Sequence, residues 1–167
     1  MKKLSLDIKA LKEVLSYDPE SGLFTWQKRT STCVRVGAVA GCKDAYGYVV
    51  IRIYGVLYKA HRLAFAFMGK ELGDSLVDHK DGNPSNNRFS NLRPATHDEN
   101  MRHSKKQDNC TSKWKGVCWD KRRGKWISRI VFQGRVHNLG RFDCEREAAE
   151  EYMFAALELH GDYARLQ

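Results

Sequence analysis

The sequence predicts an α+β protein with two domains joined by a short linker. Residues 76–100 follow the order strand, polar loop, strand and helix. Residues 101–113 are polar and basic without periodicity. From Trp114 onward, three short strand-like runs separated by glycine-containing turns precede one long helical segment. We therefore place the first domain at residues 1–104, the linker at 105–113 and the second domain at 114–167.

The first domain begins with shorter elements. Four apolar residues share one stripe of a short helix that stops near Asp18: Leu6, Leu11, Val14 and Leu15. Residues 23–27 are expected to form a strand. Residues 47–53 and 56–60 predict a hairpin closed at Tyr54-Gly55. An apolar helix from Ala60 to Met68 then ends at a glycine.

The polar residues that suggest chemistry lie between Val77 and Asn100. Asp78 and His79 follow an apolar pair and precede a loop rich in Gly, Pro, Ser and Asn. Asn91 is the first residue of the next strand-like segment. Thr96 is followed three residues later by a glutamate, the spacing of a capping box, which places Asn100 in the first turn of a helix.

These residue types suit hydrolysis of a phosphodiester, which needs a base, charge neutralisation and a group that orients the base. His79 has the intrinsic pKa of a base near neutral pH. Asp78 and Asn100 offer oxygen ligands for Mg²⁺ or Mn²⁺. The side-chain carbonyl of Asn91 is expected to accept a hydrogen bond from the other imidazole nitrogen of His79 and so to fix its tautomer. An ordinary polar loop with Asx turns has a similar composition, but four matched positions favour the catalytic interpretation.

The same residues resemble the HNH nucleases, which have a ββα-metal fold, and most closely the phage-type HNH homing endonucleases. The resemblance rests on HRL (61–63), DHKDGN (78–83), NNR (86–88), NLR (91–93) and the T-x-x-x-N that ends at Asn100. It places the ββα-metal core at about residues 76–104. It implies that His79 is the general base, Asn91 the central asparagine, and Asp78 and Asn100 the metal ligands. The final Asn in place of His favours Mg²⁺, with Mn²⁺ possible, over zinc.

Two further histidines are possible site residues. His61, at the start of the apolar helix, either approaches the metal or packs beneath the site as a structural histidine, and the second is favoured. His103, three residues after Asn100, either touches phosphate or metal-bound water, or is a solvated linker histidine. The solvated state is favoured for His103.

Composition indicates a polyanionic partner. The 167 residues include 29 Lys and Arg against 20 Asp and Glu, which gives a formal charge of +9. No run of eighteen apolar residues occurs and the N-terminus is amphipathic, so we expect no membrane association and a cytoplasmic location, in the host cell if the gene is phage-encoded. Five widely spaced cysteines without a C-x-x-C pair indicate neither a zinc knuckle nor a disulfide framework.

The second domain is predicted to be a three-stranded antiparallel sheet packed on one α-helix. Residues 115–120, 125–133 and 135–142 predict the strands, and Asp143 is expected to cap a helix from Glu145 to about His160 that Gly161 closes. A stripe of small residues on this helix allows it to lie close against one face of the sheet. The other face remains free, and a β-ribbon fits the DNA major groove.

This segment resembles the Apetala-type (ethylene-response-factor) DNA-binding domain. The resemblance covers residues 114–167 and rests on KGV (115–117), GKW (124–126), LGRFD (139–143), EREAAEEY (145–152) and HGDYARL (160–166). It implies duplex DNA as the partner, but Cys118, Val131 and Asn138 replace family Arg or Trp positions, so the target sequence does not transfer. Trp126 and His137 are expected to face the helix. The candidate DNA contacts are Trp119, Lys121, Arg122, Arg123, Lys125, Arg129, Arg135 and Asn138.

Taken together, the sequence predicts a metal-dependent endonuclease that hydrolyses DNA at a lengthy site, as homing endonucleases do. Arg88, Arg93 and Arg102 are the candidate contacts to the DNA backbone near the chemistry. One metal site per chain fits either a nicking monomer or a DNA-bound dimer that cuts both strands. Two alternatives are a non-catalytic transcription regulator that binds DNA through the C-terminal sheet and an RNA-binding or structural basic protein. The intact motif disfavours the first alternative.

Overall fold

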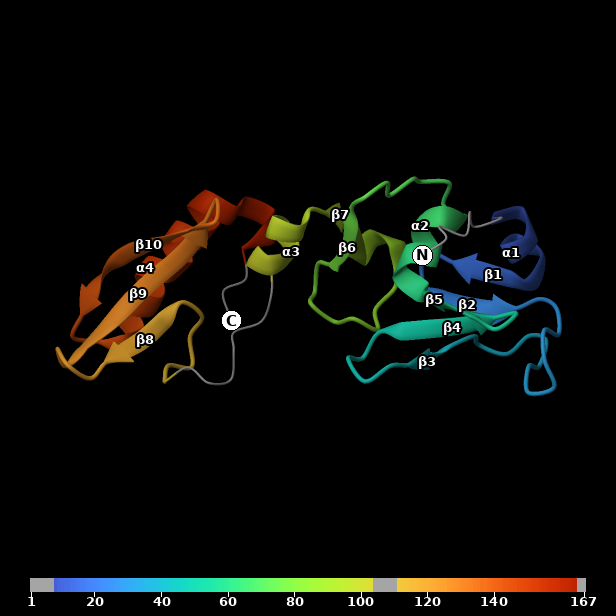
Figure 1. Cartoon of the computed structure of the whole chain (residues 1–167), viewed down its shortest axis with the longest axis horizontal. Coiled ribbons are helices and arrows are strands. Elements are labelled where there is room, and N and C mark those ends of the chain that lie inside the picture. The colour runs from blue at the N-terminus through green and yellow to red at the C-terminus, as the bar shows by residue number, and fades with distance from the viewer. Residues whose placement is uncertain (1–7, 104–110, 165–167) are drawn as a thin grey trace. The chain divides into compact units, whose positions relative to one another are not determined.

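The computed structural model describes residues 8–103 and 111–164, and it divides into two compact units, Met1–Pro94 and Ala95–Gln167 (Figure 1). Each unit has its own cluster of buried apolar side chains. The boundary precedes helix α3, which the sequence analysis assigned to the end of the first domain. Residues 105–110 of the predicted linker lie outside the described residues. In the described part of the chain, no helix is long and apolar enough to cross a membrane.

The first unit begins with α1 (Ile8–Val14), followed by β1 (Leu15–Asp18) antiparallel to β2 (Leu23–Trp26). The prediction that this helix continues to near Asp18 is therefore wrong, because the helix ends at Val14 and a strand follows. Pairing places Leu15 opposite Trp26 and leaves it only 1% exposed, so a tertiary contact overrides local helical periodicity.

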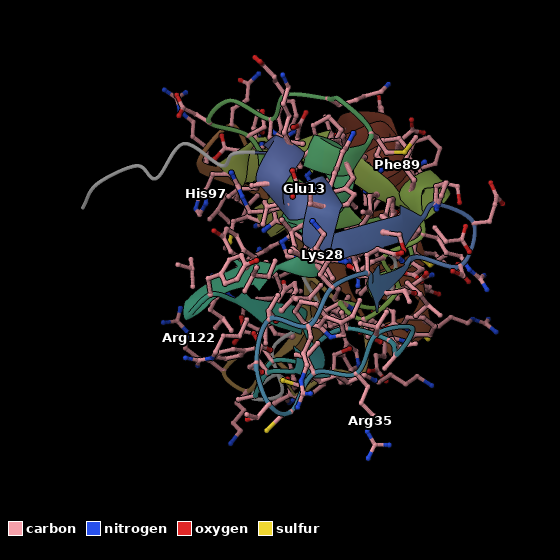
Figure 2. All side chains as sticks on the ribbon, turned by 90° about the vertical axis from the view of Figure 1, so that its right-hand side faces the viewer. Glu13, Lys28, Arg35, Phe89, His97 and Arg122 are labelled. Carbon is pink, nitrogen blue, oxygen red and sulfur yellow. The ribbon has the colours of Figure 1, made fainter. Side chains whose placement is uncertain are left out.

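An ion pair joins α1 to the residues after β2. Lys28 Nζ lies 3.0 Å from Glu13 Oε2, and both residues are labelled in Figure 2. Both side chains are more than half exposed, so the pair adds at most about 1 kcal/mol to stability.

The predicted hairpin is present as β4 (Val49–Ile53) and β5 (Val56–Lys59), and β3 (Cys42–Lys43) pairs with the other edge of β4. Helix α2 (Ala60–Phe67) follows, as predicted. Strand β4 and helix α2 pack their apolar side chains into the core of this unit. The fully buried members of that contact include Ile51, Ile53, Leu63 and Ala64.

The candidate catalytic stretch forms a second, smaller sheet. Strand β6 (Leu76–His79) pairs with β7 (Leu92–Ala95), and a short 3-10 helix, η1 (Phe89–Asn91), leads into β7. The long loop between β6 and η1 returns the chain from the end of one strand to the beginning of the other. This arrangement confirms the predicted order of strand, loop and strand.

The second unit contains α3 (His97–Arg102), whose N-terminus has the predicted capping box between Thr96 and Glu99. Strands β8 (Val117–Asp120), β9 (Lys125–Phe132) and β10 (Arg135–Phe142) form an antiparallel sheet in the order β10-β9-β8. Helix α4 (Glu145–His160) lies along one face of this sheet (Figure 1), and η2 (Gly161–Tyr163) ends the described chain.

Contact between α4 and the sheet depends on small side chains, as the sequence predicted. Ala148 and Ala156 are fully buried against an apolar cluster that includes Val117 and Ile130. The predicted N-cap of α4 is wrong by one residue, because Cys144 occupies that position. Asp143 instead forms an ion pair with Lys125.

Candidate active site

His79 is the last residue of β6 and is only 5% exposed. Its Nε2 lies 3.4 Å from Oδ1 of Asn87, a residue of the loop that is 3% exposed. The amide of Asn87 also donates to the carbonyl oxygen of Ser85 at 3.3 Å. The imidazole is thus held by a buried side chain from the polar loop.

Two aromatic rings pack against the same imidazole. The centroids of the His61 and His79 rings are 5.3 Å apart in an edge-to-face arrangement. The Tyr48 ring lies 5.3 Å from His61 and 5.9 Å from His79. The Lys59 ammonium lies 4.4 Å from the centroid of the Tyr48 ring. These contacts make His61 a packing partner of His79, which fits the structural interpretation of this residue.

Burial lowers the pKa of His61 from 6.5 to about 3, and the positive charges of His79, Lys59 and Arg62 act in the same direction. The Nδ1 atom of His61 is buried and has no hydrogen-bond partner among the described residues. His61 is therefore a neutral ring near neutral pH and adds no charge next to His79.

The buried His61 makes stability depend on pH. Between its folded-state pKa of about 3 and the ordinary value of 6.5, the unfolded chain binds more protons than the folded chain. The free energy of unfolding therefore falls as pH drops through this window, by at most about 1.4 kcal/mol per pH unit. We expect His61→Phe, which keeps a ring but cannot titrate, to lose less stability between about pH 7 and about pH 4.5. Urea unfolding of both proteins at the two pH values measures the difference, and equal losses contradict it.

Asp78 is paired with Arg93. Both Nε and Nη2 of the Arg93 guanidinium lie 2.7 Å from Asp78 Oδ2. The Arg93 side chain is 13% exposed and the Asp78 side chain 6%. The hydrogen bond that Nε donates is charge-assisted, so it is strong and orients the carboxylate. Arg93 was expected to contact the DNA backbone, whereas in this structure its guanidinium binds the predicted metal ligand.

The expected hydrogen bond from His79 to Asn91 is wrong. Asn91 Oδ1 accepts from the backbone N–H of Asp81 at 3.1 Å, and its amide donates to Asp81 Oδ1 at 3.0 Å and to the Asn86 carbonyl at 2.9 Å. The side chain of Asn91 therefore closes the polar loop, and the asparagine that reaches His79 is Asn87.

Asp81 is the acceptor at the centre of this loop. Burial is the largest single influence and raises its pKa, but hydrogen bonds from Asn86, Asn83 and Asn91 together lower it below the ordinary value. Asn86 Nδ2 donates at 2.6 Å and the backbone of Asn83 at 2.8 Å. A carboxylate with several donors fixes the loop conformation without regular secondary structure.

The residues expected to bind a metal offer oxygen atoms. Asp78, on β6 of the first unit, has a carboxylate, and Asn100, half-buried on α3 of the second unit, has an amide oxygen. No group of three or more His, Cys, Asp or Glu side chains arranged for a metal occurs in residues 8–103 and 111–164. A closed structural zinc site would require such a group, whereas Mg²⁺ keeps several waters and needs only one or two protein ligands.

Arg88, which follows Asn87 in the polar loop, is exposed, and a contact with the DNA backbone requires such exposure. Arg102 lies with its guanidinium 5.3 Å from the Phe132 ring, and its carbonyl accepts from Lys115 Nζ at 2.6 Å. The expectation of a solvated His103 is wrong, because this residue is only 9% exposed.

The predicted contacts of the sheet divide between its two faces. Residues directly opposite each other share a face, and Trp119 is opposite Trp126, which packs against the core under α4. Trp119 therefore lies on the helix-covered face. Arg129 is opposite Asn138, and both of these residues are exposed. Because Arg129 follows the buried Ser128 and neighbouring strand residues point to opposite faces, Arg129 and Asn138 lie on the free face. Exposed cations also occupy the β8–β9 turn and the start of β10: Lys121, Arg122, Arg123 and Arg135.

Comparison with known proteins identifies the family. A family model described as HNH endonuclease matches residues 58–102, which include Asp78, His79, Asn91 and Asn100. Protein 3.8 of Escherichia phage T7 is 37% identical over 91 residues, 54% of this chain and 74% of that protein. Residues 58–102 therefore match the HNH endonuclease family. Uncharacterized HNH endonuclease L560 of Acanthamoeba polyphaga mimivirus is 32% identical over 120 residues, 71% of this chain and 61% of that protein.

A solved structure on DNA binding and cleavage by the HNH homing endonuclease I-HmuI is also similar, with a TM-score of 0.46 and 21% identity over 92% of this chain and 89% of that chain. The match of the family model confirms the HNH resemblance of residues 58–102. The Apetala-type resemblance of residues 114–167 stays a prediction.

The sequence analysis does not identify two residues that contact His79 in the candidate site. Asn87 stands in the NNR motif but was given no role, and Tyr48 was treated only as part of a strand. No periodicity marks residues of an irregular loop. The doubled asparagine of NNR was the one available signal, and it did not distinguish Asn86 from Asn87.

Proposed function

We propose that this HNH endonuclease hydrolyses phosphodiester bonds of duplex DNA with a divalent metal, Mg²⁺ or Mn²⁺, at a specific site as homing endonucleases do. The observation that carries the proposal is the buried Asp78-His79 pair at the end of β6. There, His79 is held by Asn87 and Asp78 is held by Arg93. A base and an anionic ligand side by side in a basic chain match what hydrolysis of a polyanion requires.

In the proposed reaction, His79 takes a proton from water as the water oxygen bonds to phosphorus and the bond to the leaving 3′ oxygen breaks. The leaving 3′ oxygen takes a proton from solvent, and the products are a 5′ phosphate and a 3′ hydroxyl. Asp78 and Asn100 would hold the metal, which when bound neutralises charge on the phosphate and the leaving oxygen. Asn91 maintains the loop through Asp81, and Arg88 and Arg102 are the remaining candidates for backbone contacts.

The proposal assigns recognition to the free face and the basic turn of the second unit, in the manner of the Apetala-type domain. Arg129 and Asn138 lie opposite each other on that face. The β8–β9 turn adds three exposed cations, and phosphate contacts of this kind supply most sequence-independent affinity. Trp119 is the weakest candidate, because its register places it beside Trp126.

Incubation of the full chain with duplex DNA and with RNA of the same sequence, each with Mg²⁺, tests this function. We expect cleavage of the duplex DNA and none of the RNA. Binding of DNA without cleavage indicates a regulator, and preferential binding or cleavage of RNA contradicts DNA as the substrate.

The role of the free face predicts a change in salt dependence. Arg129→Ala should weaken binding to duplex DNA and lower the slope of log affinity against log salt by about 0.9, because one phosphate contact is lost. Arg146→Ala is the matched control, since this arginine is exposed on α4 and paired with Glu150. It removes the same charge outside the free face. Equal slopes for the two variants, measured by fluorescence anisotropy, contradict the assignment.

A further inference from the structure

The side-chain orientation of Asn87 is determined by its neighbours. Its amide group lies between His79 Nε2 at 3.4 Å and the Ser85 carbonyl oxygen at 3.3 Å. A backbone carbonyl can only accept a hydrogen bond, so the Nδ2 of Asn87 faces Ser85 and its Oδ1 faces His79. The imidazole nitrogen next to Oδ1 must then carry the hydrogen.

The backbone of Asn87 is held by the hairpin of β1 and β2. The Tyr17 hydroxyl donates to the Asn87 carbonyl oxygen at 2.7 Å, and the N–H of Phe89 donates to the carbonyl oxygen of Pro19 at 3.0 Å. The turn of the hairpin comes so close that a Cβ on Gly22 would stand 2.3 Å from the Arg88 nitrogen. Residues far apart in the sequence thus determine the position of this loop.

Tyr17 is itself rigidly placed and remains a donor. Its ring stacks on Phe24 with centroids 4.6 Å apart and meets the edge of Phe67 at 6.4 Å. Burial, with the charge of Asp18 as a second cause, raises the pKa of the Tyr17 hydroxyl to about 12. The hydroxyl therefore stays protonated across the pH range of enzyme assays.

We propose that Asn87 is the positioning residue for His79 and that Tyr17 of the β1–β2 hairpin holds Asn87 in place. Asn87 Oδ1 accepts the Nε2–H of His79, which fixes the tautomer whose lone pair is on Nδ1, the nitrogen that takes the proton from water. This inference rests on the proposed function for the role of the base. It assigns a catalytic purpose to an N-terminal hairpin that lies outside the residues matched by the family model.

Histidine nitrogen NMR on the full chain tests the inference without substrate. We expect the Nε2–H tautomer of His79 in the wild type and in Asn87→Asp, which retains an acceptor, and a loss of that preference in Asn87→Ala. Tyr17→Phe should shift the tautomer ratio in the same direction, whereas Tyr46→Phe should not, since Tyr46 is 82% exposed. Thermal melting of each variant verifies that it is folded.

Cleavage kinetics give the second readout. We expect Asn87→Ala to lower kcat on the order of tenfold to a hundredfold with little change in KM, and Asn87→Asp to recover most of the rate. An unchanged tautomer in a folded Asn87→Ala overturns the inference; if that variant does not fold, an unchanged tautomer in Tyr17→Phe overturns it. A wild-type chain that shows the Nε2–H tautomer but cuts no DNA refutes the proposed function and leaves the positioning of His79 intact.

Discussion

Replacing His79 with alanine is expected to lower the rate of DNA cleavage by about two to four orders of magnitude, the usual contribution of a general base. His79 is the one histidine next to Asp78, and Asn87 holds its ring. Binding of DNA should remain nearly unchanged, because His79 is only 5% exposed and the candidate phosphate contacts lie elsewhere. Single-turnover cleavage and equilibrium binding of the same duplex measure the two effects separately.

His137→Ala is the matched control for this experiment. His137 is an exposed histidine on β10, opposite Ile130 and near Phe132, and it has no role in the proposed chemistry. Its variant should cleave at the wild-type rate. A His79→Ala protein that cleaves at a near wild-type rate would show that another residue is the base and that the site is wrongly assigned.

Removal of divalent metal is the second change expected to abolish activity. Asp78 and Asn100 offer oxygen atoms only, so a chelator should stop cleavage and excess Mg²⁺ or Mn²⁺ should restore it. Binding of DNA through exposed cations such as Arg129 should persist in the chelator, because counterion release does not require the metal. Gel assays of cleavage and binding in the same samples distinguish loss of chemistry from loss of affinity.

A metal-ligand variant completes that test. Asn100→Ala should raise the Mg²⁺ concentration needed for half-maximal cleavage. We prefer it to a change at Asp78, whose loss removes one half of a buried ion pair with Arg93 and costs about 3–5 kcal/mol of stability. Cleavage that persists after thorough chelation indicates a metal-independent mechanism and contradicts the proposal.

The elements with strong periodicity were predictable from the sequence. The β4–β5 hairpin, α2, the three strands of the second unit and α4 lie within a few residues of their expected positions. Local patterns sufficed because each of these elements buries one regular face. Strand β1 was not predictable in this way, since Leu15 fits a helical stripe and becomes a strand only by pairing with Trp26.

The two residues at the centre of the candidate site are predictable from local sequence. Asp78 and His79, with the spacing to Asn91 and Asn100, indicate the HNH family, and the family model matches the same residues. This was possible because a composite motif with fixed spacing rarely occurs by chance.

The contacts that hold Asp78 and His79 depend on the folded chain. The tertiary structure placed Asn87 instead of Asn91 against His79, Arg93 on Asp78, and the neutral ring of His61 beside the base. The physical reason is that an irregular loop has no period from which side-chain directions follow. The position of Asn87 depends on Tyr17, seventy residues earlier in the chain, and local sequence carries no record of such a contact.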